Sequence, residues 1–198
     1  MPQTPANNPT HGQTPEPTHE PDHPSLEPIR RAFAGKGLQA GTYRGQTTVI
    51  CPPEHLHELL RFLRDDPACA YDFLSDVAGV DYLNYPKAPG RFGVVYNLVS
   101  TTHNHRLIVK VHLDPSVDTS GTEHDPALHL PTATDIWPGA EWNEREVFDM
   151  FGIRFDGHPD LRRILTWETY PAHPLRKDYP LRGRGERDDY RILTRESA

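Results

Sequence analysis

The sequence predicts an α+β fold: a two-layer domain with a mixed or antiparallel sheet and helices on one side, followed by a long irregular C-terminal arm. Three observations predict it. One segment repeats its leucines with the period of an amphipathic helix, two neighbouring segments are strand-like around a short polar loop, and residues 153–198 show almost no regular pattern. We therefore divide the chain into a Pro-rich tail (1–28), an α+β domain (29–152) and the C-terminal arm (153–198).

The tail is set apart by its composition. It holds eight of the 21 prolines of the chain, with one leucine and no Phe, Trp or Tyr. Such a segment cannot bury enough apolar surface to offset the loss of chain entropy, so we expect it to be disordered. No Lys or Arg precedes Arg30 and no apolar centre is present, which argues against a secretory signal or a transit peptide.

The first half of the domain predicts a short helix at 29–33 and then a strand at 43–50, rich in Thr and Val. Residues 52–66 predict an amphipathic helix. Its leucines fall at i, i+3, i+4 and i+7: Leu56, Leu59, Leu60 and Leu63. Residues 71–83 contain apolar side chains without a clear period, so no element is assigned there.

The second half of the domain begins with a predicted β-hairpin. Two apolar-rich runs, 91–100 and 106–113, surround a polar loop of five residues. Residues 114–130 are polar and loop-like. A helix follows and ends at Gly152, a residue type favoured just after the last helical turn.

Composition excludes several classes of function. The chain has 21 basic and 28 acidic residues and a formal charge of −7, which argues against a nucleic-acid coat. It lacks a glycine-rich phosphate-binding motif and a nucleophile motif of the G-x-S-x-G kind. No apolar run approaches the roughly 20 residues of a membrane span. The residues alone therefore argue against an autonomous enzyme.

Metal and redox centres are not predicted either. Cys51 and Cys69 lie 18 residues apart and cannot build an iron–sulfur cluster or a structural zinc site. Two histidine pairs have i, i+2 spacing: His55/His57 and His103/His105. On a helix this spacing places the two rings on different faces, and no third ligand accompanies the second pair. We expect no catalytic, cofactor-binding or metal-ligating residue in this chain.

Residues 140–152 are the most informative stretch. At 100° per residue, Glu144 lies in the apolar stripe of the predicted helix. A carboxylate there needs a partner, and Arg162 or Arg163 could supply an ion pair that ties the helix to the arm. Alternatively, Asn143 is the N-cap with Glu146 at N3, and Glu144 is an exposed acid of the first turn. The sequence leaves both interpretations open.

The C-terminal arm has too much apolar material for plain disorder and too little periodicity for a domain. Between Gly157 and Gly185, six Lys and Arg stand against three Asp and Glu, a local excess of +3. We expect this arm to find no packing surface on its own domain. It should instead dock on a partner, through acidic protein surfaces or lipid headgroups.

Two motifs resemble the signatures of a known family of NADH-quinone oxidoreductase, the 30 kDa subunit family of respiratory complex I. The first is Glu144-Arg145-Glu146-x-x-Asp149-Met150-Phe151-Gly152 followed by Gly157-His158-Pro159-Asp160-Leu161-Arg162-Arg163-Ile164-Leu165. The second is Pro174-Leu175-Arg176-Lys177-Asp178-Tyr179-Pro180-Leu181. The resemblance marks these residues as folding and docking elements: Glu144, Arg145, Glu146, Asp149, Gly152, His158, Pro159, Arg162, Arg163, Arg176, Lys177 and Asp178.

The resemblance implies a structural subunit without a cofactor of its own, in the peripheral arm of a proton-pumping complex on the cytoplasmic side of the bacterial cell membrane. In that complex, FMN, iron–sulfur clusters and quinone are bound by partner subunits as electrons pass from NADH to quinone. The implied partners are the subunit that shapes the quinone pocket and the adjacent iron–sulfur subunits. Membrane association would occur only through the complex.

Three alternatives remain at this point. The first is the equivalent subunit of an energy-converting hydrogenase, or of a dehydrogenase fed by ferredoxin or a reduced deazaflavin. The second is a free-standing binding module that uses the basic arm on acidic partners. The third is a histidine-based metalloenzyme. Co-purifying subunits separate the first two from the favoured interpretation, and metal analysis tests the third.

Overall fold

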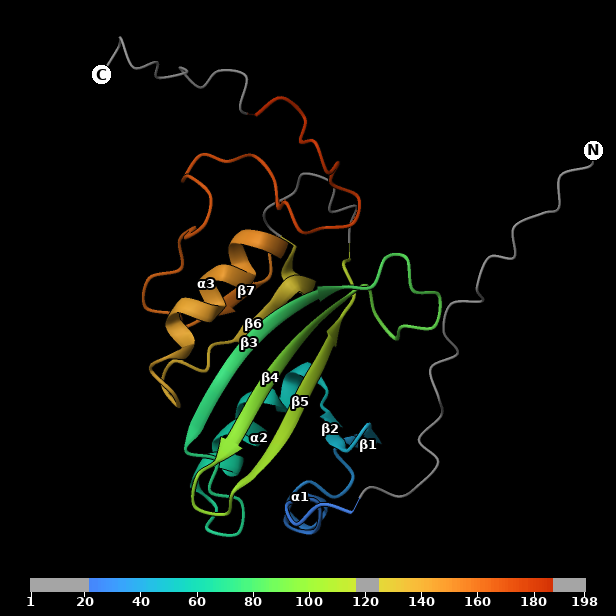
Figure 1. Ribbon diagram of the computed structural model, residues 1–198, viewed down its shortest axis with the longest axis vertical. Helices are drawn as coiled ribbons and strands as arrows, with labels where there is room; N and C mark the ends of the chain where they lie inside the picture. The colour runs from blue at the N-terminus through green and yellow to red at the C-terminus, as the bar shows by residue number, and fades with distance from the viewer. Residues whose placement is uncertain (1–21, 117–124, 187–198) are drawn as a thin grey trace, which may run out of the picture.

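The computed structural model describes residues 22–116 and 125–186 and shows a mixed five-stranded sheet with helices packed on one face (Figure 1). The strand order is β1-β2-β5-β4-β3. The strands are β1 (Gln39–Tyr43), β2 (Gln46–Ile50), β3 (Phe73–Asp81), β4 (Phe92–Ser100) and β5 (His105–Leu113). Two short strands, β6 (His129–Pro131) and β7 (Arg154–Asp156), pair in parallel as a second sheet. The predicted α+β class is confirmed.

The β4–β5 hairpin confirms the two strand-like runs. The strands pair antiparallel along their whole length, from Phe92 opposite Leu113 to Ser100 opposite His105. Because strand side chains alternate between the two faces, one row of each strand faces the helices. Tyr96 in that row is completely buried. The hairpin is therefore the centre of the sheet and of the hydrophobic core.

The predicted single strand at 43–50 is wrong in part, because the chain turns back within it. Arg44 and Gly45 have φ angles of 49° and 76°, the left-handed conformations that a two-residue hairpin turn needs. β1 therefore runs back antiparallel to β2, with Tyr43 opposite Gln46. β2 pairs in parallel with β5, which makes the sheet mixed.

The unassigned stretch 71–83 contains β3, at one edge of the sheet. The pairing of β3 with β4 shifts between Leu74 and Asp76, where the strand has a bulge. A bulge inserts one residue and reverses the side-chain alternation beyond it. This irregularity explains why the apolar residues of β3 have no clear period in the sequence.

The helices are α1 (Leu26–Ala32), α2 (Leu56–Asp65) and α3 (Ala140–Phe151), with a 3-10 turn η1 (Pro53–His55) before α2. The predicted leucine stripe of α2 is confirmed, since all four leucines are completely buried. α3 packs against β3 so closely that the Phe151 ring leaves no room for a side chain at Gly79. Both helices join the buried side of the sheet in one hydrophobic core.

Two predicted boundaries need correction. α1 begins at Leu26, inside the segment predicted as tail, because Leu26 and Ile29 are buried in the core. The rest of the tail prediction falls on residues 1–21, outside the described ranges. The predicted loop 114–130 contains η2 (Pro126–Leu128) and β6, while its residues 117–124 lie outside those ranges. Across the described residues, no helix has the length and apolar character to cross a bilayer.

The C-terminal arm begins with β7 and then follows an irregular path along α3 (Figure 1). Tyr170, Ala172, His173 and Arg176 are buried. The expectation that the arm finds no packing surface on its own domain is therefore wrong for this stretch. The prediction that the arm docks on a partner is a separate matter, and residues 187–198 of the arm lie outside the described ranges.

Candidate functional site

The candidate site is the junction between α3 and the C-terminal arm, which contains both sequence motifs. α3 begins after Gly139, and its end is fixed by Gly152, which has the left-handed φ of 75°. The helix thus starts three residues before Asn143, and the predicted capping box of Asn143 and Glu146 is wrong. Glu146 lies on the exposed side of α3, away from the arm.

Glu144 is completely buried, which rules out the exposed first-turn interpretation. The predicted ion pair with Arg162 or Arg163 is also wrong. The Glu144 carboxylate accepts hydrogen bonds from Thr132 Oγ1 (2.6 Å) and from the backbone N–H of Ala133 (2.7 Å). Its face of α3 is turned toward the segment that follows β6, so Glu144 fixes that segment rather than the arm.

The environment of Glu144 favours its neutral form. Burial raises the pKa of Glu144 to about 7, and the hydrogen bonds from Thr132 and Ala133 only partly oppose that effect. A carboxyl with two neutral donors and no cation can hold its proton at a cost smaller than that of an unpaired buried charge. Glu144 is therefore a structural group whose charge depends on pH near neutrality.

Asp149 makes the tie to the arm that the sequence assigned to Glu144. Arg163 Nη1 lies 2.8 Å from Asp149 Oδ1, and both side chains are almost completely enclosed. Asp149 Oδ2 accepts the backbone N–H groups of Ile164 (3.1 Å), Leu165 (2.8 Å) and Thr166 (2.8 Å). Thr166 Oγ1 donates to Asp149 Oδ1. One carboxylate thus fixes a complete turn of the arm.

These bonds outweigh the cost of burying the Asp149 charge. Burial alone would raise the pKa of Asp149, but the hydrogen bonds from Thr166 and Arg163 hold that pKa below its usual range. Five residues separate Asp149 from Glu144, which places the two carboxylates on different faces of α3. The sequence signal for Asp149 was its place in the first motif, since periodicity alone did not single it out.

Arg145 and His158 bind the arm through its backbone and that of α3. Arg145 Nε and Nη2 donate to the carbonyls of Arg162 and Arg163, each at 3.1 Å. His158 Nε2 donates to the carbonyl of Glu141 at 3.0 Å. Pro159 and Arg162 are exposed, and Arg162 pairs with Asp160 at the surface (2.7 Å). The first motif therefore divides into buried anchors and exposed neighbours.

The second motif fastens the arm at the C-terminal end of α3. Arg176 is buried, and its Nε donates to the carbonyl of Phe151 at 2.7 Å. Burial and the nearby Arg91 lower the pKa of Arg176 to about 10. The backbone N–H of Lys177 donates to Asp81 (2.8 Å), and Arg91 bridges Asp81 (3.4 Å) and Asp178 (2.8 Å). The arm is thus attached to β3 as well as to α3.

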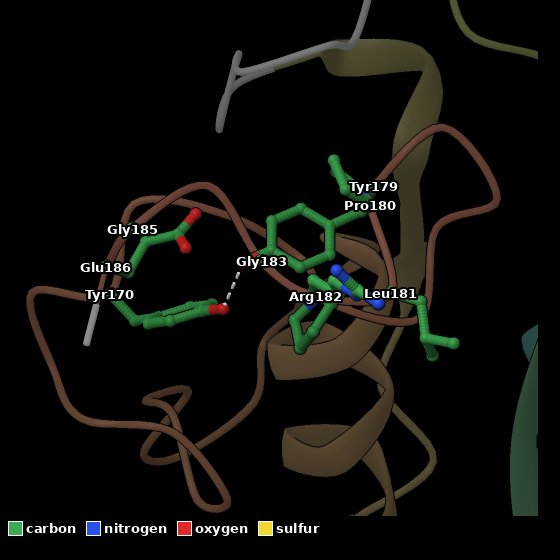
Figure 2. Close-up of a pocket in the computed structure, with 9 residues that line it drawn as sticks. Tyr170, Tyr179, Pro180, Leu181, Arg182, Gly183, Gly185 and Glu186 are labelled. Carbon is green, nitrogen blue, oxygen red and sulfur yellow. Dashed lines mark hydrogen bonds between the residues drawn. The ribbon is translucent and has the colours of Figure 1, made fainter. Parts of the chain in front are cut away.

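Beyond these attachments the arm encloses a cavity of about 500 Å³. Figure 2 shows its walls, where the hydroxyls of Tyr170 and Tyr179 are hydrogen-bonded at 2.6 Å. The other lining residues are Pro174, Pro180, Leu181, Arg182, Gly183, Gly185 and Glu186. Three leucines of the arm are largely exposed, namely Leu165 (63%), Leu175 (49%) and Leu181 (104%).

The histidine pairs serve the fold. His57 binds Asp135, and His103 and His105 stack with ring centroids 5.5 Å apart in the β4–β5 turn. Within residues 22–116 and 125–186, no three His, Cys, Asp or Glu side chains are grouped as a metal site. The arrangement at α3 offers buried anchors and an exposed apolar and basic surface, which is the chemistry of assembly.

Comparison with known proteins supports the same direction. The family model described as "Respiratory-chain NADH dehydrogenase, 30 Kd subunit" matches residues 49–185. The C subunit of NADH-quinone oxidoreductase from Roseiflexus sp. (strain RS-1) is 46% identical over 79% of this chain and 82% of its own length. The first of the numbered C subunits of Rhizobium meliloti (strain 1021) is 50% identical over 78% of this chain and 70% of its own length.

Two solved structures share the fold. A trypsin-resistant fragment of Nqo5 has a TM-score of 0.56 at 36% identity and covers 69% of this chain and 98% of its own. A chain of the membrane-bound sulfane sulfur reductase, an archaeal respiratory membrane complex, has a TM-score of 0.61 at 22% identity over 85% of this chain and 92% of its own, a likeness of fold alone. The match over residues 49–185, which includes both anchored motifs, shows that this chain belongs to the 30 kDa subunit family of respiratory-chain NADH dehydrogenase, the family that contains the C subunits of NADH-quinone oxidoreductase.

Proposed function

We propose that this chain acts as a structural subunit without a redox cofactor of its own, and that its C-terminal arm docks on neighbouring subunits. As a member of its family, it is a subunit of the NADH-quinone oxidoreductase complex, in the peripheral arm. The proposed neighbours are the subunit that shapes the quinone pocket and the adjacent iron–sulfur subunits. FMN, clusters and quinone would be held by those partners, on the cytoplasmic side of the bacterial membrane.

A single observation carries the docking proposal. The arm is held to its own domain mainly through backbone groups and buried anchors such as Asp149 and Arg176, while its leucines face outward. Leu181 is fully exposed, which leaves an apolar side chain with no role inside this chain. Exposed apolar side chains held by a fixed backbone are typical of a surface that a partner covers.

The charge of the arm supports a protein partner with acidic groups. Arg182 and Arg184 are exposed near the rim of the cavity, and Arg184 lies over the Tyr179 ring, 5.4 Å from its centroid. Apolar side chains flanked by arginines are common at the centres of protein interfaces. The positive charge would orient the arm on an acidic neighbour during assembly.

The test replaces Leu165 and Leu181 together by Ser in the full-length chain and purifies the complex through a tag on another subunit. Both positions are exposed, so we expect the thermal unfolding midpoint of the isolated subunit to stay unchanged. The amount of subunit in the complex should fall about tenfold or more, the usual loss when two interface anchors are truncated. Normal incorporation of this double variant would refute the docking role of the arm.

A matched control is Leu83→Ser, which changes a leucine of similar exposure (47%) in the β3–β4 loop. We expect it to be incorporated normally. The same purification tests the identity of the assembly. Co-purification with an NADH- and flavin-binding subunit supports the proposed complex, whereas its absence with a hydrogenase subunit present would favour the related energy-converting complexes.

A further inference from the structure

The face of the five-stranded sheet that points away from α2 and α3 is the feature we consider. In β4, Val94, Tyr96 and Leu98 are completely or almost completely buried toward the helices. Val95 and Val99 alternate with them and therefore point to the other side, where they are partly exposed. Figure 1 shows β3, β4 and β5 in front of α2, with this second face toward the viewer.

The apolar character of this face continues across four strands. Phe73 of β3 stands opposite Val99 of β4, and Phe73 is 54% exposed. On β5, Ile108 stands opposite Asn97, and Ile50 of β2 lies beyond Lys110 in the register. A sheet face that meets water usually carries polar side chains in these positions. This face instead presents Ile, Val and Phe.

Two cations interrupt the apolar rows. Arg106 pairs in register with Val99, and Lys110 pairs in register with Val95. Neither side chain forms an ion pair with another residue of the described ranges, and the Lys110 ammonium lies 5.9 Å from the centroid of the Tyr82 ring. Asp76, at the β3 edge beside Asn97, is the acidic group in these rows. The face is therefore apolar and net positive.

We propose that this open sheet face, made of Ile50, Phe73, Val95, Val99, Ile108 and Lys110, is a second docking surface of the subunit. Its occupant is an apolar surface of another subunit of the same complex, with carboxylates facing Arg106 and Lys110. The proposal rests on the proposed function. The arm is attached at α3, on the other side of the sheet, so the subunit has two interfaces and lies between neighbours.

Charge decides among the occupants that an apolar face can have. A symmetric dimer of two copies would bring Arg106 and Lys110 of both copies onto one positive interface, because such a contact uses the same patch twice. Like charges placed together at an interface cost several kcal/mol. An acidic and apolar partner surface satisfies both components of this face, and a second copy does not.

The test introduces Ile108→Asp and, separately, Lys110→Glu into the full-length subunit in cells that make the whole complex. Both positions lie at the surface of a sheet, so the unfolding midpoint of each isolated variant should remain close to that of the native chain. We expect the amount of subunit in the purified complex to fall about tenfold for each, as when like charges meet at an interface. Controls are Ile108→Val, which keeps the apolar surface, and Lys87→Glu, an exposed cation outside the face.

A photoreactive amino acid at position 108 gives a second, independent measurement in the purified complex. We expect a cross-link to one peptide of another subunit that contains Asp or Glu. Three results would overturn the proposal: normal incorporation of both charged variants, self-association of the native chain that Ile108→Asp abolishes, or binding to anionic lipid vesicles that Lys110→Glu abolishes.

The arm variants separate this proposal from the proposed function. If Leu165→Ser with Leu181→Ser prevents incorporation while the Ile108 and Lys110 variants are incorporated normally, only the second docking surface is refuted. If the native chain does not associate with other subunits of the complex at all, the proposed function itself fails.

Discussion

The carboxylate of Asp149 and the guanidinium of Arg163 form a buried ion pair, with Oδ1 and Nη1 2.8 Å apart and side-chain exposures of 0% and 5%. This pair links the last turn of α3 to the arm. Arg163 Nη1 also donates to the carbonyl of Ala172 at 3.0 Å. The ion pair therefore connects the helix to two successive stretches of the arm, and the stability of the domain should depend on it.

We predict that Asp149→Asn strongly destabilises the folded chain. The amide would present N–H groups to donors and leave the Arg163 charge buried without its carboxylate. Removing one member of a buried pair typically costs about 3–5 kcal/mol. Urea unfolding, followed by circular dichroism, measures the free energy of unfolding. Glu146→Gln on the exposed side of the same helix should change it by less than about 0.5 kcal/mol, and equal losses in the two variants would contradict the assignment.

Glu144 predicts a pH dependence with a defined sign. Its pKa is raised by burial to about 7 in the folded chain, against 4.5 for the unperturbed group. A raised carboxyl pKa contributes stability that is complete below pH 4.5 and is lost as the pH rises through 7. A rise of this size is worth about 3 kcal/mol between the two limits.

The variant Glu144→Gln removes that titration and can keep both hydrogen bonds, one accepted from Ala133 and one shared with Thr132. Compared with the native chain, its free energy of unfolding should gain about 3 kcal/mol between pH 4.5 and pH 8. Denaturant titrations at several pH values measure this difference. Parallel pH profiles for native and variant chains would show that Glu144 keeps an ordinary pKa.

The elements that the sequence predicts best are those with a local cause. The α2 helix follows from four leucines on one face, and the end of α3 follows from Gly152, which takes the left-handed conformation. The β4–β5 hairpin follows from two apolar runs. In each case the signal and the structure lie within the same short segment, so no distant contact is needed.

The errors arise where a distant contact or a backbone irregularity decides. The partner of Glu144 is Thr132, a residue of another segment that periodicity cannot select. The bulge in β3 hides its alternation, and the turn at Arg44 divides a strand-like run. Arm packing depends on Asp149, whose side chain binds backbone groups, and backbone groups leave no mark in the sequence.

We predict that both cysteines are inert in the folded chain. Cys51 and Cys69 are 1% and 0% exposed. Burial, together with Glu54, raises the pKa of Cys51 to about 12, and burial with Asp66 raises that of Cys69 to about 11. Because the thiolate is the reactive form, labelling by a disulfide reagent at pH 8 should be at least about 100-fold slower than in denaturant.

The thiol control places a cysteine at an exposed site of β3. The variant Ser75→Cys should label rapidly at its new thiol while Cys51 and Cys69 remain unmodified. Mass spectrometry of the labelled peptides distinguishes the three sites. Rapid labelling of Cys51 or Cys69 in the native chain would show that its segment opens readily.

The last prediction compares two glycines with the same backbone conformation. Gly152 and Gly157 have φ angles of 75° and 83°, so alanine is strained at either position. At Gly157 a Cβ would meet only Thr132, at 3.4 Å, and the expected loss is about 1 kcal/mol. At Gly152 a Cβ would lie 2.6 Å from His173 Nε2 and closer still to Arg176 Nη2.

Those two side chains cannot easily move, because His173 Nδ1 donates to the Asp149 carbonyl and Arg176 Nε donates to the Phe151 carbonyl. Gly152→Ala should therefore cost about 2 kcal/mol more than Gly157→Ala, a value typical of overpacking. Urea unfolding of both variants measures the difference. It should also make residues 170–176 more sensitive to protease in Gly152→Ala alone, since the collision displaces the arm. Equal losses with equal protease resistance would mean that the arm does not press on the end of α3.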